Sequence, residues 1–138
     1  MTKEEFIVEL NKDLEYEYAA AIQYVQHAAV ITGPEYDAIA EELQIHADEE
    51  INHAKQISDL VCDLDGTPTV EVDERKISED AKTMLEQDLE GEQTAIRRYK
   101  ERIAQAEELK EYGVRRVLEE ILMEEEEHRR DLLGALGR

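Results

Sequence analysis

Two Glu-x-x-His motifs are the residues of this sequence with the clearest capacity for chemistry. They are Glu50 with His53 and Glu125 with His128, and one shift of 75 residues superimposes the first motif on the second. Side chains at i and i+3 share one face of a helix, so each motif can direct a carboxylate and an imidazole to the same point. Both are common metal ligands, so each motif is a candidate half of a metal site.

The same shift relates a second pair of segments. LNKDLEYEYAAAIQY, residues 10–24, aligns with LEQDLEGEQTAIRRY, residues 85–99, and seven of the fifteen positions are identical. Glu17 and Glu92 are among the identical positions, so each half of the chain contributes one further glutamate. The repeat predicts two similar helical hairpins related by an approximate two-fold axis.

The spacing of the four glutamates predicts that they lie at one height in a bundle. Two residues of an antiparallel hairpin are level when they are equally far from its turn. Glu17 and Glu50 lie 16 residues on either side of the Gly33–Pro34 turn, and the same 33 residues separate Glu92 from Glu125. If the hairpins are two-fold related, all four carboxylates converge on one layer.

This layer predicts a buried site for two metal ions. Buried carboxylates are costly unless they are paired or bind metal. Four carboxylates and two imidazoles suit a pair of iron ions, with manganese as the alternative, whereas a single zinc uses about four ligands. The predicted ligands are Glu17, Glu50, His53, Glu92, Glu125 and His128.

Four long helices are needed to position these side chains. Thr2 and Glu5 form a capping-box pattern that opens the first helix, which extends to Gly33–Pro34. The second helix carries an inward seam that steps by three and four residues, as expected for a bundle helix. The seam consists of Tyr36, Ile39, Leu43, His46, Glu50, His53, Ile57, Leu60 and Leu64.

A long polar connection separates the two halves. It runs from Pro68 to about Lys76, and Ser78 is the predicted N-cap of the third helix. That helix extends to about Tyr112–Gly113, and the fourth carries a seam from Val114 to Ala135. The expected fold is all-α, a four-helix bundle with one long crossover between helices two and three.

Composition limits the classes of function. The 138 residues suit a single domain, 1–138, with one core. A net charge of −20 argues against nucleic acid and anionic membranes as partners, and favours cations. The lone Cys62 cannot form an intrachain disulfide, and no segment has the pattern of a signal peptide or a transmembrane span. We therefore expect a cytoplasmic protein.

Several residues beside the layer have two interpretations. Asp13 and Asp88 are repeat-equivalent and are expected to lie level with the two histidines of the motifs. Each is predicted to accept a hydrogen bond from the second ring N–H of a histidine, and a solvated polar edge is the alternative. His46 on the seam is interpreted as a hydrogen-bonded core residue. The run Glu124–Glu127 is interpreted as mostly a solvated face, and only Glu125 has the seam position.

The quoted segments, together with Glu50-Ile51-Asn52-His53-Ala54 and Glu125-Glu126-Glu127-His128, resemble bacterioferritin over about residues 6–133. The resemblance implies a ferritin-like fold in which Glu50 and Glu125 bridge two iron ions. Glu17 with His53, and Glu92 with His128, would be the terminal ligands. The implied activity is oxidation of Fe(II) by O2 or H2O2, with ferric mineral stored in a cage of identical subunits.

The resemblance also assigns a role to a tyrosine. In this family a tyrosine at the position of Tyr24 hydrogen-bonds a ligand carboxylate and can be oxidised. Its repeat equivalent, Tyr99, has the same two interpretations, a tyrosine bonded to a ligand carboxylate or an ordinary core tyrosine, and the second is preferred for it.

The sequence departs from bacterioferritin at two places. Ile51 stands where the family has a haem-binding methionine, so we expect no haem bound in the usual way. The chain ends ten residues after His128, which leaves no room for the fifth helix of large cages, so the size of the expected homo-oligomer stays open.

Two other functions remain as alternatives. The first is a rubrerythrin-like peroxidase or a dimanganese catalase without iron storage. Rubrerythrins share the six-ligand arrangement, but they usually add a cysteine-rich domain and a further glutamate where this chain has Ala95. The second is a helical interaction protein whose site is structural.

Overall fold

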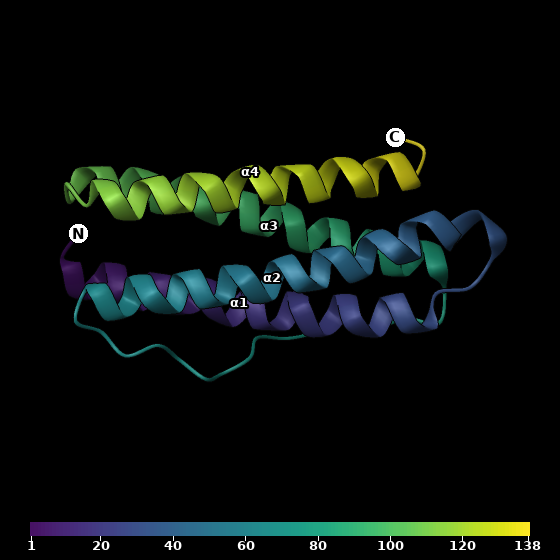
Figure 1. The fold of residues 1–138 in the computed structure, drawn as a ribbon, viewed down its shortest axis with the longest axis horizontal. Helices are drawn as coiled ribbons and strands as arrows, with labels where there is room; N and C mark the ends of the chain where they lie inside the picture. The colour runs from purple at the N-terminus through teal and green to yellow at the C-terminus, as the bar shows by residue number, and fades with distance from the viewer.

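The structure, a computed structural model that describes residues 1–138, consists of four long helices and no strands (Figure 1). One turn of 3-10 helix, η1, lies between the first two. The elements are α1 (Lys3–Val30), η1 (Pro34–Tyr36), α2 (Asp37–Asp63), α3 (Ala81–Glu108) and α4 (Tyr112–Ala135). This is the predicted four-helix bundle, and its long crossover lies between α2 and α3.

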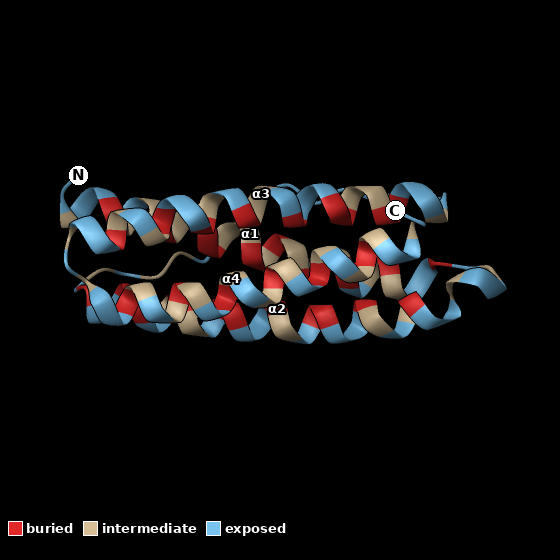
Figure 2. Ribbon diagram, turned by 90° about the horizontal axis from the view of Figure 1, so that it is seen from above, coloured by how far each residue is buried: buried red, intermediate tan, exposed pale blue.

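The helices pack as two antiparallel hairpins. Helix α1 packs mainly against α2, and α3 against α4, while the hairpins meet through α1 with α3 and α2 with α4. Figure 2 shows the buried residues along the faces that the helices turn toward one another. None of the helices contains an uninterrupted apolar stretch of the length that a membrane-spanning helix needs.

The start of α1 follows its sequence signal. The Thr2 side chain accepts a hydrogen bond from the Glu5 amide at 3.1 Å, and the Glu5 carboxylate accepts one from the Thr2 amide at 2.9 Å. The predicted capping box is therefore confirmed, and it satisfies two amides that the helix cannot pair internally.

Two helix boundaries differ from the prediction. Helix α3 is capped by Asp80, which accepts from the Thr83 amide at 2.9 Å, and the predicted cap Ser78 instead accepts from the Asp80 amide. The same helix ends at Glu108, because Lys110 adopts a left-handed conformation with φ of 61°. Gly113, expected near the stop, lies inside α4.

The crossover lies along α1 (Figure 1). Asn11 bonds the backbone of Thr69, the Asp73 amide donates to the Glu15 carbonyl, and Gln23 accepts from the Lys76 amide. Satisfied backbone groups of this kind fix a segment that has no regular structure of its own. The crossover is therefore attached to the same helix over several turns.

The core has two apolar parts with a polar layer between them. One part surrounds Phe6, Ile57 and Leu118, and the other surrounds Leu43 and Leu85. Burial of such side chains contributes about 1.5–3 kcal/mol each. The predicted metal layer occupies the segment of each helix between these parts.

Candidate metal centre

All six predicted ligand side chains converge in the polar layer. None is more than 2% exposed. They come from all four helices, because one glutamate lies on each of α1 and α3 and a Glu-x-x-His motif lies on each of α2 and α4. The six are Glu17, Glu50, His53, Glu92, Glu125 and His128.

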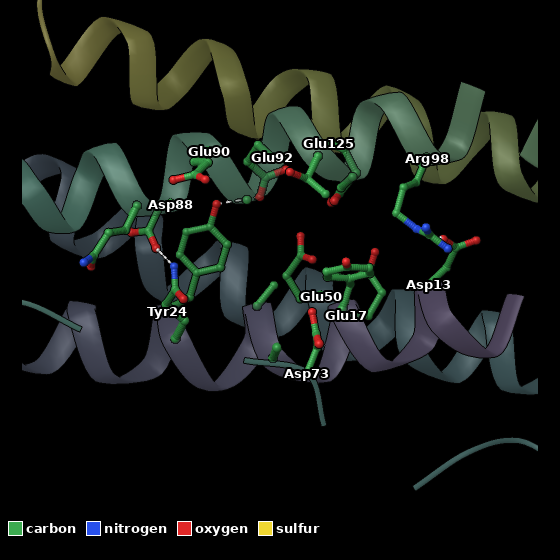
Figure 3. A pocket seen from close by; sticks show the side chains of 18 of the residues that line it. Asp13, Glu17, Tyr24, Glu50, Asp73, Asp88, Glu90, Glu92, Arg98 and Glu125 are labelled. Carbon is green, nitrogen blue, oxygen red and sulfur yellow. Dashed lines mark hydrogen bonds and ion pairs between the residues drawn. The ribbon is translucent and has the colours of Figure 1, made fainter. Parts of the chain in front are cut away.

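The six side chains form two overlapping groups. Glu50 and Glu125 belong to both groups, and Glu17 with His53 completes one while Glu92 with His128 completes the other. Within each group the ligand atoms lie within 4.8 Å of one another. Figure 3 shows the four carboxylates pointing toward one another between the hairpins. This geometry can hold two cations side by side with two shared carboxylates.

The histidines point their Nδ1 atoms into the centre. His53 Nδ1 lies 3.2 Å from Glu125 Oε1 and 3.5 Å from Glu17 Oε2. His128 Nδ1 lies 3.0 Å from Glu50 Oε1 and 3.4 Å from Glu92 Oε1. Both Nδ1 atoms also approach the shared carboxylates, at 3.8 Å or less from Glu50 Oε1 and Glu125 Oε1. The rings differ in their second neighbour, which is Glu17 for His53 and Glu92 for His128.

The polar atoms at the centre fit a metal pair because they lack other partners. Despite the short distances, no hydrogen bond satisfies one oxygen on each glutamate or either nitrogen of the two rings. Buried polar atoms without partners are rare in proteins, since each costs about 1–3 kcal/mol. Metal coordination would satisfy them, and two divalent cations would balance four carboxylate charges.

Without metal, protons must supply the balancing charge. Burial and the nearby Glu125 raise the pKa of Glu50 well above its usual value and that of Glu92 to about 8. Burial opposes protonation of His53 and His128, but their carboxylate neighbours outweigh it and raise each pKa to about 11. The metal-free centre therefore holds protons at neutral pH.

Two tyrosines bind the centre from opposite hairpins. Tyr24 on α1 donates to Glu92 on α3 at 2.6 Å, and Tyr99 on α3 donates to Glu17 on α1. The carboxylate contact expected for Tyr24 is confirmed. The interpretation of Tyr99 as an ordinary core residue is wrong, because the two-fold relation gives it the same contact in the other half.

The predicted partners of the histidines are wrong. Asp13 accepts hydrogen bonds from Arg98 and Arg102, and Asp88 is bonded to Gln23 and His27. These side chains bond between α1 and α3, and no hydrogen bond joins them to the histidines of α2 and α4.

Two other glutamates lie beside the outer ring nitrogens. Glu124 Oε1 is 3.5 Å from His53 Nε2, and Glu49 Oε2 is 3.4 Å from His128 Nε2. Glu124 is therefore partly solvated, as its run predicted, but it also contacts His53, which the sequence did not indicate. Glu49 precedes Glu50 as Glu124 precedes Glu125, so their recurrence at the repeat shift was the signal that could have identified them.

His46 is the hydrogen-bonded core residue that the seam indicated. It is 1% exposed, and its Nε2 lies 3.0 Å from Asp131 Oδ2. Its ring stacks on the His128 ring with centroids 4.0 Å apart. Burial and the nearby His128 lower the pKa of His46 to about 4, so the ring is neutral at neutral pH.

A cavity of about 320 Å³ connects the centre with the side of the bundle formed by α1, α3 and the crossover. All four central glutamates line its inner part, and small residues such as Ala20 and Gly91 line its wall. Figure 3 shows Asp73 and Glu90 near the same cavity. The cavity gives small solutes access to the carboxylates from one side.

Comparisons with known proteins agree with this geometry. The sequence profile described as a ferritin-like domain matches residues 7–138. The chain is 30% identical to a bacterioferritin of Brucella melitensis over 138 residues, which cover 95% of this chain and 86% of that protein.

Two solved structures have the same fold. Ferritin-like, diiron-carboxylate proteins from Bacillus anthracis give a TM-score of 0.93 at 31% identity, over 99% of both chains. A dodecameric thioferritin, the bacterioferritin-related protein from Bacteroides fragilis, gives 0.92 at 30% identity, over 99% of this chain and 87% of that one. The similarity thus extends over both hairpins and the polar layer between them.

Proposed function

This chain belongs to the ferritin-like domain family, and on that premise we propose that it is a di-iron ferroxidase. Its substrate is Fe(II), its oxidant is O2 or H2O2, and its purpose is iron storage or detoxification in the cytoplasm. One observation carries the proposal: six metal-ligating side chains from all four helices meet where the core is otherwise apolar.

In this proposal Glu50 and Glu125 would be shared by the two iron ions, because each belongs to both groups of ligand atoms. Glu17 and His53 would hold one ion, and Glu92 and His128 would hold the other. Two Fe(II) ions that become Fe(III) release two electrons, which with two protons reduce O2 to H2O2, or H2O2 to two waters. Tyr24 and Tyr99 orient the terminal carboxylates by donating to them.

The cavity between α1, α3 and the crossover is the proposed entrance for Fe(II). Four carboxylates at its inner end attract cations, and Asp73 and Glu74 add negative charge nearby. The net charge of −20 adds a long-range attraction for divalent ions.

We propose a homo-oligomer for the intact protein. The Bacteroides fragilis relative is dodecameric, and this chain exposes apolar side chains on the outer face of α1, including Val8, Ile22 and Val25. Exposed apolar residues that cluster on one face mark interaction surfaces. Ile51 supports a protein without haem bound in the usual way, which the visible spectrum of purified protein would test.

The decisive experiment mixes metal-free protein with excess Fe(II) in air and follows oxygen uptake, peroxide consumption and particle size. We expect oxidation and the growth of ferric particles within assemblies. Glu125→Gln should slow oxidation by more than about a hundredfold, since even outer partners of metal ligands contribute up to that factor. Glu127→Gln, on the exposed face of the same helix, is the matched control and should oxidise at the parent rate.

Other outcomes would contradict the proposal in distinct ways. Peroxide turnover without particles would indicate the peroxidase or catalase alternative, for which the same donor set also suits manganese. Equal rates of Fe(II) oxidation in the parent protein and in Glu125→Gln would mean that the centre takes no part in the oxidation.

A further inference from the structure

We propose that Lys76 controls the passage of divalent cations through the cavity that leads to the paired centre. Lys76 belongs to the crossover and lines the cavity, and its ammonium nitrogen lies 3.1 Å from Glu90 Oε1 on α3. Because the two side chains are 44% and 64% exposed, this ion pair lies at the outer end of the cavity. The inference rests on the proposed entry of metal ions through this cavity.

The main chain of Lys76 is held from both sides. Its amide donates to Gln23 Oε1 at 2.7 Å, and its carbonyl oxygen lies 3.0 Å from His27 Nε2. Gln23 Nε2 and His27 Nδ1 each lie 2.9 Å from Asp88 Oδ1 on α3. His27 and Asp88 are at most 3% exposed, so a buried polar cluster fixes the backbone of one exposed lysine. The side chain of Lys76 therefore starts from a fixed point beside the cavity.

The ion pair between Lys76 and Glu90 is too exposed to be explained by stability. Exposed pairs of this kind contribute little to folding, because water and salt screen them. The charge of Lys76 matters for passage instead, since the four glutamates at the inner end attract cations and an ammonium group at the outer end repels them. A divalent cation is attracted to Glu90 twice as strongly as a monovalent one, so it displaces the ammonium group more readily than Na⁺ or K⁺ does.

Two other cationic side chains line the cavity, but neither connects the crossover with α3. Arg98 donates to Asp13 and to Glu9, both on α1. Arg97 is exposed and belongs to α3 itself. Lys76 is thus the one cation that the crossover contributes to the cavity.

The space beside the ion pair is open. Gly91 follows Glu90 and also lines the cavity, and a Cβ atom at Gly91 would meet no atom of another element within 4 Å. Its repeat equivalent in the other half of the chain is Tyr16. Since no side chain fills this space at position 91, an entering cation has to overcome the charge of Lys76 and not a steric barrier.

The rate of Co(II) uptake by metal-free protein tests the inference, because Co(II) bound to carboxylates and imidazoles absorbs visible light. In stopped-flow mixing at low salt, Lys76→Gln should take up Co(II) about threefold faster than the parent, since one repelling charge is gone from the outer end of the cavity. Lys76→Arg keeps the charge and should retain the parent rate. Both variants should still bind two ions per chain at the end of the reaction.

Two matched variants separate the position of the charge from the net charge of the chain. Lys55→Gln removes a positive charge from an exposed residue of α2 that does not line the cavity, and its uptake rate should stay close to that of the parent. Arg97→Gln removes one at the cavity, but not between the crossover and α3, and should accelerate uptake less than Lys76→Gln does. An unchanged rate in Lys76→Gln, or an equal acceleration in Lys55→Gln or Arg97→Gln, would overturn the inference.

The same variants distinguish this inference from the proposed function. Faster Co(II) uptake by Lys76→Gln, in a protein whose parent does not oxidise Fe(II), would refute the ferroxidase and support the role of Lys76. Oxidation of Fe(II) by the parent, with Co(II) uptake unchanged in Lys76→Gln, would refute the role of Lys76 and leave the ferroxidase standing.

Discussion

Glu50 shows how far the centre departs from ordinary core packing. Leu43 and Ile57, seven residues before and after it on the α2 seam, are fully buried aliphatic residues, and the acidic Glu50 is equally buried at 1% exposed. Burial and three neighbouring glutamates, Glu125 foremost, all raise its pKa. Every one of these influences disfavours the ionised carboxylate in metal-free protein, so the proposed role of Glu50 in metal binding comes at the expense of stability.

Replacement of this glutamate should therefore stabilise the metal-free protein. We expect Glu50→Leu to raise the free energy of unfolding by about 1–3 kcal/mol, since apolar replacements of buried ionic groups are often stabilising. The same variant should no longer gain thermal stability from added metal. Leu43→Ala is the control and should cost about 2–5 kcal/mol. Loss of stability in Glu50→Leu would mean that the carboxylate has a structural partner other than metal.

Metal loading should release protons at neutral pH. With pKa values of about 11 for His53 and His128 and about 8 for Glu92, these three groups are mainly protonated at pH 7 and must lose protons to bind metal. We expect about three protons from them per metal pair, and affinity that rises with pH toward 8. Calorimetry in buffers of different ionisation enthalpy measures this release, and a value near zero would contradict it.

At the same scale, residue types and spacing predicted which side chains enter the centre but not all of their contacts. Seam position and level from the turn were sufficient for the six central residues. Direction around the helix axis was not determined for Asp13 and Asp88, which turn to the neighbouring helix. Small rotations decide such contacts, and only the packed helices fix them.

At the scale of the helices, two related clusters of hydrogen-bonded polar side chains, here called braces, join α1 to α3. Asp13 is held by Arg98 and Arg102, and the repeat shift of 75 residues converts these into Asp88, Gln23 and His27. One brace thus contains permanent positive charges, and the other an amide and an imidazole. The two-fold relation of the helices is kept while the chemistry of the braces differs.

Removal of the first brace should destabilise the bundle without affecting metal binding. Asp13→Ala removes the buried charged partner of the Arg102 guanidinium, which is 1% exposed, and leaves only the more distant Glu9 at 3.6 Å, so it should cost about 3–5 kcal/mol in urea unfolding. Asp88→Ala should cost less, because its partners include no arginine. Both variants should still bind two metal ions per chain. If a folded Asp13→Ala protein lost its metal, Asp13 would have the supporting role beside the centre that the sequence predicted.

Helix boundaries were less predictable than helix faces. Ser78 and Asp80 both have side chains suited to an N-cap, and the competition between them is settled by the geometry of the crossover. Helix α3 ends before Lys110, which adopts a left-handed conformation. Glycine is the usual sequence marker of this conformation, and a lysine at this position gave no such marker. The 3,4 seam of α2, by contrast, repeats over many turns, so its inward face was predicted correctly.

At the scale of the whole molecule, charge should govern the entry of iron. An ion approaching a chain of net charge −20 is attracted over about 30 Å at 0.01 M salt but only about 10 Å at 0.1 M. We therefore expect the initial rate of Fe(II) oxidation to fall by about tenfold over this range. Glu74→Gln at the cavity should show a smaller salt dependence. A rate independent of salt would contradict electrostatic attraction.

The most direct test of the paired centre is Mössbauer spectroscopy of protein loaded with two 57Fe(II) per chain and then oxidised. Two ferric ions that share Glu50 and Glu125 couple their spins, so the low-temperature spectrum should be a diamagnetic doublet without magnetic splitting. The magnetically split spectrum of isolated ferric ions would contradict a centre in which all six side chains hold two irons together.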